Sequence, residues 1–161
     1  MTKLRNHYLA TFVAMVVLSG NLLIAAGNSA STNAQAKAKI KKAISISKNA
    51  DLDFGEAYTG DSEKTLDASS NEGAQFSVNG ENNKAYSITL PSSVTMSTDD
   101  GVGADKQIVV NSFNSNPGAS SGQLSASGSQ TLYVGGTRAA ISSSQYSGDY
   151  VGSFQVTVTY Q

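Results

Sequence analysis

The chain has 161 residues, a formal net charge of −1, one histidine and no cysteine. This length suits a single domain, and the lack of cysteine excludes a disulfide framework, thiol catalysis and cysteine-based zinc sites. Charged residues make up 14% and aromatic residues 7% of the chain, while serine, threonine and glycine are abundant. This composition favours an exposed, extracellular β-domain.

Residues 1–36 have the features of a secretory signal peptide. Lys3 and Arg5 give a short basic region, and the apolar run 9–26 follows. Ala34-Gln35-Ala36 fits the small-residue cleavage rule, so we expect cleavage after Ala36, with Ala26 and Ala30 as alternative sites. A retained membrane anchor is the alternative, but the run is interrupted and short for a span of about 20 apolar residues. The sequence therefore predicts export through the periplasm to the cell surface or the medium.

Residues 37–48 form a basic N-terminal arm that contains five lysines and no acid. The body from residue 49 onward holds all twelve acidic residues and four basic ones. A basic arm on an acidic body predicts self-association, and a solvated terminus is the alternative. The acidic body and the short arm argue against a nucleic-acid partner.

The body, residues 49–161, contains repeated short segments with strand character, separated by turn residues. Asn79-Gly80 and Gly135-Gly136 are turn signals, and we interpret residues 115–129 as a flexible loop. This spacing predicts an all-β, antiparallel β-sandwich. The expected strands are residues 43–47, 52–54, 74–78, 86–90, 94–96, 108–113, 130–134, 139–141 and 150–161.

The final segment has the clearest strand pattern. Phe154, Val156, Val158 and Tyr160 alternate with polar residues, and this period of two is typical of a half-buried strand. We expect another element to hold this strand at the edge of a sheet.

Several motifs together resemble the secreted bacterial family DUF4402. They occur in one order over nearly all of the domain, and this resemblance implies fold and export but no activity. The motifs are Leu52-Asp-Phe-Gly55, Phe76-Ser-Val-Asn-Gly80, Tyr86-Ser-Ile-Thr-Leu-Pro91, Val134-Gly-Gly-Thr137 and the segment from Tyr150 to Tyr160.

The C-terminus is also similar to that of chaperone–usher pilins, which end in an alternating strand with a penultimate aromatic residue. Tyr160 is penultimate here, and Gly148 stands where those pilins have a glycine. The resemblance implies an Ig-like sandwich whose groove receives first a periplasmic chaperone and then a neighbouring subunit. The implied assembly strand consists of Gly148, Tyr150, Phe154, Val156, Val158 and Tyr160.

The arm would then act as the donor strand. Ala38, Ile40, Ile44 and Ile46 share one parity, which Lys42 interrupts. In strand addition, backbone pairing supplies affinity and alternate side chains fill pockets. The alternative is that Ile44 and Ile46 belong to the first strand of their own domain.

Enzymatic chemistry is not expected. Cleavage removes the only histidine, and no serine lies in a G-x-S-x-G motif. Ser45-Ile-Ser-Lys48 has the S-x-x-K spacing but lies on an expected strand rather than a helix turn. Asp99, Asp100 and Asp105 are weak candidate Ca²⁺ ligands that lack EF-hand spacing, which favours a solvated turn.

The sequence therefore predicts a fimbrial or pilin-like structural subunit that is not an enzyme and needs no cofactor. Its expected partners are identical subunits, a periplasmic chaperone and an outer-membrane usher, and it meets a membrane only during export. The alternative is a self-contained surface or matrix module that binds carbohydrate or protein, for which Tyr146 and Tyr150 could stack on sugars.

Overall fold

A computed structural model describes residues 27–98, 101–118 and 120–161. The chain divides into two compact units, Met1–Ala38 and Lys39–Gln161. The described part of the first unit, residues 27–38, is exposed and without regular secondary structure. Most of the predicted signal peptide, residues 1–26, lies outside the described residues.

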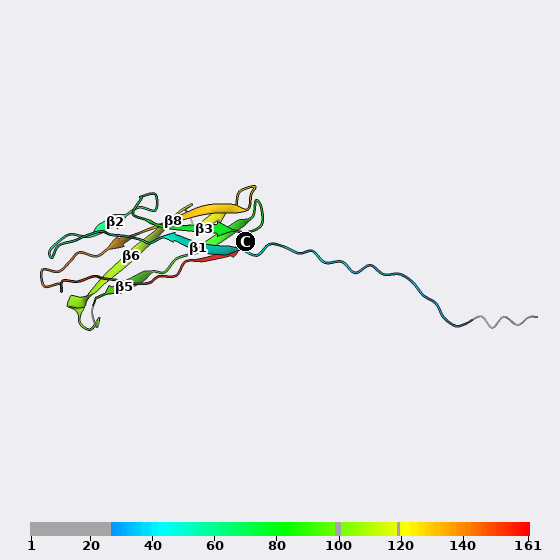
Figure 1. Ribbon diagram of the computed structural model, residues 1–161, viewed down its shortest axis with the longest axis horizontal. Coiled ribbons are helices and arrows are strands. Elements are labelled where there is room, and N and C mark those ends of the chain that lie inside the picture. The colour runs from blue at the N-terminus through cyan, green and yellow to red at the C-terminus, as the bar shows by residue number, and fades with distance from the viewer. Residues whose placement is uncertain (1–26, 99–100, 119) are drawn as a thin grey trace, which may run out of the picture. The chain divides into compact units, whose positions relative to one another are not determined.

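Within the described ranges, the second unit folds into two antiparallel sheets (Figure 1). The predicted antiparallel β-sandwich is therefore confirmed. The larger sheet has the order β1 (Ser45–Ala50), β3 (Ala74–Asn79), β8 (Ser129–Arg138), β6 (Gln107–Asn116), β5 (Ser93–Ser97), and β2 (Lys64–Leu66) also pairs with β8. The smaller sheet has the order β7 (Ser121–Gln123), β4 (Ala85–Thr89), β9 (Thr157–Tyr160), and a short 3-10 helix, η1 (Ala104–Lys106), precedes β6.

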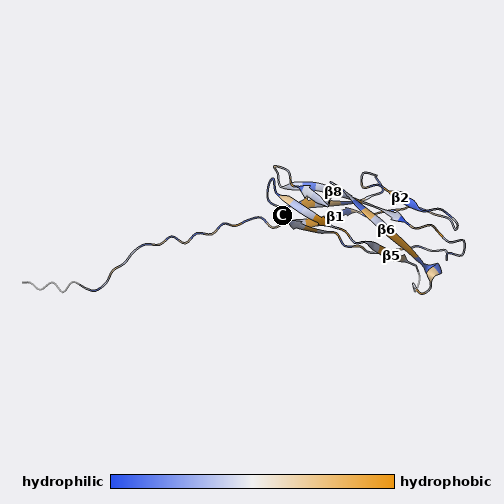
Figure 2. Ribbon diagram, turned by 180° about the vertical axis from the view of Figure 1, so that it is seen from behind, coloured by the Kyte–Doolittle hydropathy of each residue, from blue (hydrophilic) through white to orange (hydrophobic). Residues whose placement is uncertain are grey.

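The core lies between the two sheets and draws on their central strands. Val78 of β3, Tyr86 of β4 and Leu132 of β8 are each 0% exposed. Removing such side chains from water contributes about 1.5–3 kcal/mol each. Figure 2 shows hydrophobic residues over part of β6, where Ile108 and Val110 are also buried. The fold is thus held chiefly by the inward faces of β3, β4, β6 and β8.

Tyr86 brings a polar group into this core, since its side chain is 0% exposed. Its hydroxyl donates a hydrogen bond of 2.8 Å to Gln130 Oε1, which also accepts from the backbone N–H of Gln123 at 3.0 Å. Burial raises the pKa of the Tyr86 hydroxyl because it disfavours the phenolate. The bond therefore links β4 to β8 across the sandwich.

Several strand boundaries differ from the sequence prediction. Residues 52–54 and 139–141 are irregular, the predicted loop 115–129 contains β7, and β2 was not predicted. β8 runs through Gly135-Gly136, where the sequence predicts a turn. A Cβ on Gly135 would collide with the backbone of Leu66 and Ala68. Gly135 therefore allows β8 to approach the backbone of residues 66–68 closely, and the glycine pair does not end the strand.

Candidate functional site at the open edge of the sandwich

The C-terminal strand forms one edge of the smaller sheet. β9 pairs with β4 alone, and the register sets Tyr86 opposite Tyr160 and Ile88 opposite Val158. Just upstream, Val151 forms an isolated bridge to Ser97 of β5. Residues 152–156 between these pairings have no strand partner among the described residues. Only part of the predicted strand 150–161 is therefore paired.

Burial along this segment follows the predicted period of two. From Val151 to Tyr160 every second residue is exposed and the residues between them are only half-buried. The half-buried side chains pack against the same cluster as the fully buried core. They are Phe154, Val156, Val158 and Tyr160. The core is therefore incompletely covered along this edge.

The first strand forms an edge of the larger sheet, and its apolar residues meet the same cluster. β1 pairs only with β3, with Ile46 opposite Val78. Ile44 and Ile46 are half-buried against the core, whereas Ile40 is 90% exposed. The predicted arm, residues 37–48, therefore consists of two structurally different parts. Residues 45–48 lie in β1, and residues 37–44 have no regular structure.

Tyr160 joins the two edges at one end of the sandwich. Its hydroxyl donates to the carbonyl oxygen of Lys42 at 3.0 Å and accepts from the N–H of Glu81 at 2.6 Å. A Cβ on Gly80 would collide with this hydroxyl. The chain therefore enters β1 beside the end of β9, and Gly80 leaves room for the contact.

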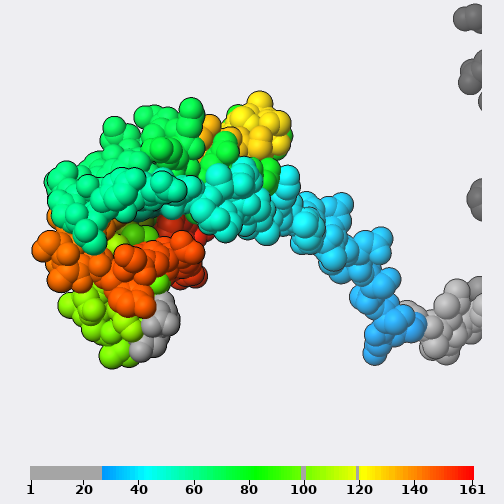
Figure 3. All heavy atoms as spheres, turned by 60° about the vertical axis from the view of Figure 1, so that its left-hand side comes forward, coloured from blue at the N-terminus to red at the C-terminus, as the bar shows by residue number. Residues whose placement is uncertain are grey.

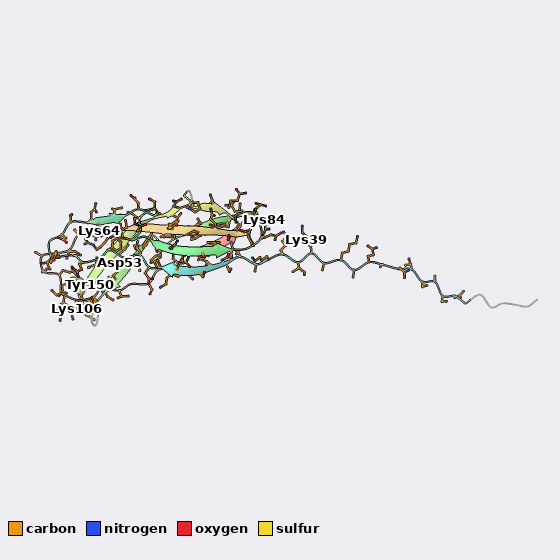
Figure 4. The ribbon with its side chains drawn as sticks, turned by 45° about the horizontal axis from the view of Figure 1, so that its top comes forward. Lys39, Asp53, Lys64, Lys84, Lys106 and Tyr150 are labelled. Carbon is orange, nitrogen blue, oxygen red and sulfur yellow. The ribbon has the colours of Figure 1, made fainter. Side chains whose placement is uncertain are left out.

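A cavity of about 630 Å³ opens at the other end, between two irregular segments. Residues 52–59 form one wall, and residues 145–150 form the facing wall. Figure 3 shows the hollow between them, and Figure 4 places Asp53 and Tyr150 at the end of the domain away from Lys84. The floor is formed by Met96, Ile108, Arg138 and Ile141. We call this space the end cavity.

Arg138 is the buried cation of the end cavity and is 5% exposed. Its Nη1 donates to the carbonyl oxygen of Ala139 at 2.8 Å, and its Nη2 donates to that of Ser62 at 3.2 Å. The guanidinium therefore ties Ser62, which follows the first wall in the chain, to β8. Its Nε–H remains without a hydrogen-bond acceptor among the described residues.

The second wall is fixed by hydrogen bonds to the turn that precedes β6. The Tyr150 hydroxyl lies 2.7 Å from the carbonyl oxygen of Tyr146 and 2.9 Å from that of Asp105. Gln145 Nε2 donates to the same hydroxyl at 3.0 Å. A Cβ on Gly148 would lie 2.5 Å from Thr98 Oγ1, so a larger residue would push this wall outward. The sequence alone did not reveal these contacts.

The other candidate residues do not form a site among the described residues. Asp99 and Asp100 lie outside them, and Asp105 is exposed, with no metal-binding cluster found in the described part. Ser45 and Lys48 point to opposite faces of β1, and Lys48 Nζ lies 2.6 Å from Asp51 Oδ1. Tyr146 is 49% exposed and its ring centroid lies 5.2 Å from Lys106 Nζ.

Comparison with known protein families matches residues 61–160 to the family described as Domain of unknown function (DUF4402). The match spans most of the chain, and the protein belongs to this family. It confirms the resemblance drawn from the sequence motifs. Neither a curated protein nor a solved structure gives a significant match. Among the described residues, no helix has the length and hydrophobicity to cross a membrane.

Proposed function

We propose that the protein is an exported, pilin-like structural subunit that assembles at the bacterial surface by β-strand donation. We call residues 152–160 the open edge, because β9 pairs only with β4 and residues 152–156 have no strand partner among the described residues. The row of half-buried apolar residues on this edge, from Phe154 to Tyr160, carries the proposal. An edge strand offers unpaired backbone groups, and an exposed edge beside apolar side chains favours pairing with another chain. An added strand would cover the half-buried row and pair with this edge.

The arm supplies a segment suited to this edge. Ala38 and Ile40 alternate with lysines and are exposed, and Ile40 is 90% exposed. An extended segment of this kind directs its apolar side chains to one face. Ile40 is the bulkiest side chain on that face and would be the main anchor.

Lys42 marks the boundary between the donated segment and the chain's own domain. Its carbonyl oxygen accepts the hydrogen bond from Tyr160 of the same chain, and Ile44 packs on the same chain's core. The break in the apolar alternation therefore falls where the arm meets its own sandwich. The donor segment would end at Lys41, and residues 42–43 would link neighbouring subunits.

The partners follow from this mode of assembly. Identical subunits would supply donor and acceptor, and a periplasmic chaperone and an outer-membrane usher would protect and deliver the open edge before assembly. Covering the edge before assembly matters because half-buried apolar residues beside an unpaired strand favour aggregation.

Deletion of residues 37–41 tests the proposal because it removes the donor segment of the arm and leaves the predicted cleavage site, Lys42, β1 and both sheets in place; we call this variant arm-deleted. We expect a folded monomer, measured by circular dichroism and light scattering, that forms no fibres by electron microscopy. Ile40→Asp in the full chain should also abolish fibres by placing a charge in the covered edge. Val109→Asp, at an exposed valine of β6, is the control and should assemble normally. Fibres formed by the deletion variant would contradict strand donation.

The end cavity supports a second candidate function, a surface module that binds carbohydrate. Tyr58 is 76% exposed and Tyr146 49% exposed, and both line the cavity. Its volume lies in the range of small-ligand sites, and aromatic rings can stack on sugars. A glycan array probed with the arm-deleted monomer separates the two functions, because a binding module keeps its ligand without assembling.

A further inference from the structure

The lysines of the arm fall on the face opposite its apolar residues. Lys37, Lys39 and Lys41 are exposed and have no ion pair among the described residues. Alternate side chains of an extended strand lie about 7 Å apart on one face. If the apolar face enters the open edge, as the proposed function requires, these lysines form a row along the outside of the donated strand.

The rim of the end cavity presents the opposite charge. Asp53 and Glu56 lie on one wall and Asp149 on the other, and all three are exposed and without an ion pair in the described part of the chain. Asp53 Oδ1 accepts from the N–H of Gly55 at 2.8 Å, which holds this carboxylate in place.

Two lysines lie beside the rim. Lys64 Nζ donates to the carbonyl oxygen of Phe54 and pairs with Glu72 at 3.5 Å. Lys106 Nζ lies 5.2 Å from the centroid of the Tyr146 ring. With Glu72 included, four carboxylates face two lysines, so the rim keeps an excess of negative charge.

Arg138 does not offset this negative rim for an arriving partner. It is 5% exposed and directs both terminal nitrogens to backbone carbonyls of its own domain. Its Nε is buried as well, so the guanidinium presents little charge to an arriving segment. The end cavity thus combines a largely apolar floor with an acidic rim, and this charge suits a basic extended segment.

We propose that Lys37, Lys39 and Lys41 of one copy pair with Asp53, Glu56 and Asp149 of the next copy when the arm enters the open edge. This inference rests on the proposed function and adds to it a pairing of opposite charges between the arm of one copy and the rim of the next. We call this pairing the charge code. The code selects the arm of another copy as the occupant, because the arm has five lysines and no acid while the body has an excess of acids. Like charges would disfavour docking of the acidic body at the same rim.

The pairing should act mainly on the rate of assembly. Exposed ion pairs contribute about 0–1 kcal/mol each, whereas complementary charged surfaces raise association rates by roughly 10- to 1,000-fold at low salt. Screening has a length of about 10 Å at 0.1 M salt. Assembly of the natural protein should therefore slow as salt is added, while the fibres that form remain similar.

Paired charge reversals in the full-length exported protein test the code by light scattering at low salt. The arm variant carries Lys39→Glu and Lys41→Glu, and the rim variant carries Glu56→Lys and Asp149→Lys. Each alone should assemble about tenfold or more slowly. Mixed together they should recover, because each arm then meets a rim of opposite charge. Lys84→Glu and the pair Glu63→Lys with Asp67→Lys, at exposed residues outside the cavity, are controls that should keep the natural rate.

The outcomes separate this inference from the proposed function. If the natural protein forms no fibres under any condition, strand donation fails and the code fails with it. If fibres form but the reversals, the mixture and added salt leave the rate unchanged, the code is overturned and strand donation stands. The neutral variant Glu56→Gln with Asp149→Asn gives an intermediate rate if the code holds, and it guards against an effect of reversal on folding.

Discussion

β8 and the C-terminal segment share an alternating apolar sequence but differ in burial. β8 lies between β3 and β6, and its inward residues Leu132 and Val134 are 0% exposed. β9 has one partner, and the inward residues of the C-terminal segment are half-buried against the same cluster. The difference shows that position in the sheet, not the pattern itself, decides how completely an apolar face is covered.

This contrast has an energetic consequence for assembly. Apolar surface that remains in water forgoes about 25 cal/mol for each Å² that burial would remove. A side chain at the centre of the sandwich has already contributed this free energy, whereas Val156 and Val158 are only half-buried. The strand donation that we propose would bury the remaining apolar surface of this edge.

The difference in burial between β8 and the C-terminal segment is tested most sharply by the same substitution, valine to alanine, made in each of them. Val134→Ala should lower the free energy of unfolding by about 2–3 kcal/mol, because it leaves a cavity in a closed core. Val158→Ala should lower it by about 1 kcal/mol, because part of the side chain is already hydrated. Urea denaturation of both variants measures the difference. Equal losses would mean that the edge is as well packed as the centre.

A peptide that supplies the donor segment should stabilise the open edge. The synthetic segment 37–43, added to the arm-deleted protein, should bind the open edge and raise the free energy of unfolding by about 2.7 kcal/mol at 100 times its dissociation constant. The midpoint of thermal unfolding should rise with peptide concentration. The same peptide with Ile40→Asp is the matched control, and equal stabilisation by both peptides would rule out insertion of the apolar face.

Tyr160 tests how firmly the two edges are joined. Tyr160→Phe removes the hydroxyl that bonds Lys42 and Glu81 but keeps the ring. We expect a loss of about 1 kcal/mol in the free energy of unfolding and faster hydrogen exchange at the Glu81 amide. Unchanged exchange at that amide would show that the hydroxyl contributes nothing to holding the edges together.

The substitution Tyr86→Phe is expected to change the pH dependence of the free energy of unfolding only slightly. It concerns the buried centre of the sandwich and not the open edge. Because burial raises the pKa of the Tyr86 hydroxyl above its ordinary value of 10.0, the unfolded chain loses this proton first. The contribution of the buried hydroxyl to stability is complete below the ordinary pKa and declines as the pH rises through the higher pKa of the folded protein. The natural protein should therefore lose more stability than Tyr86→Phe as the pH rises above about 10. Parallel curves for the two proteins would contradict the burial effect.

The sequence predicted the fold class better than the individual strand limits. Alternation in residues 74–78 and 86–90 predicted β3 and β4 to within about one residue, because each has one face in the core. Gly135-Gly136 misled the prediction, because glycine marks a turn and a close backbone approach alike. The three-residue strands β2 and β7 carry too few side chains for a period to be visible.

The candidate site was predicted in part. The apolar parity of Phe154, Val156, Val158 and Tyr160 is present in the sequence and matches their half-burial. The end cavity was not predictable, since its walls are irregular and Arg138 meets Ser62 only after folding. No local pattern records contacts between segments so far apart in the chain.

By itself the sequence determined the antiparallel sandwich, the family and the alternating face of the last strand, because each depends on local order of residues. Only the tertiary structure decided that β9 has one partner, that residues 45–48 of the arm pair with their own β3, and that a cavity lies between residues 52–59 and residues 145–150. The physical reason is that alternation fixes which side chains share a face, whereas coverage of that face depends on which strands the fold places beside it.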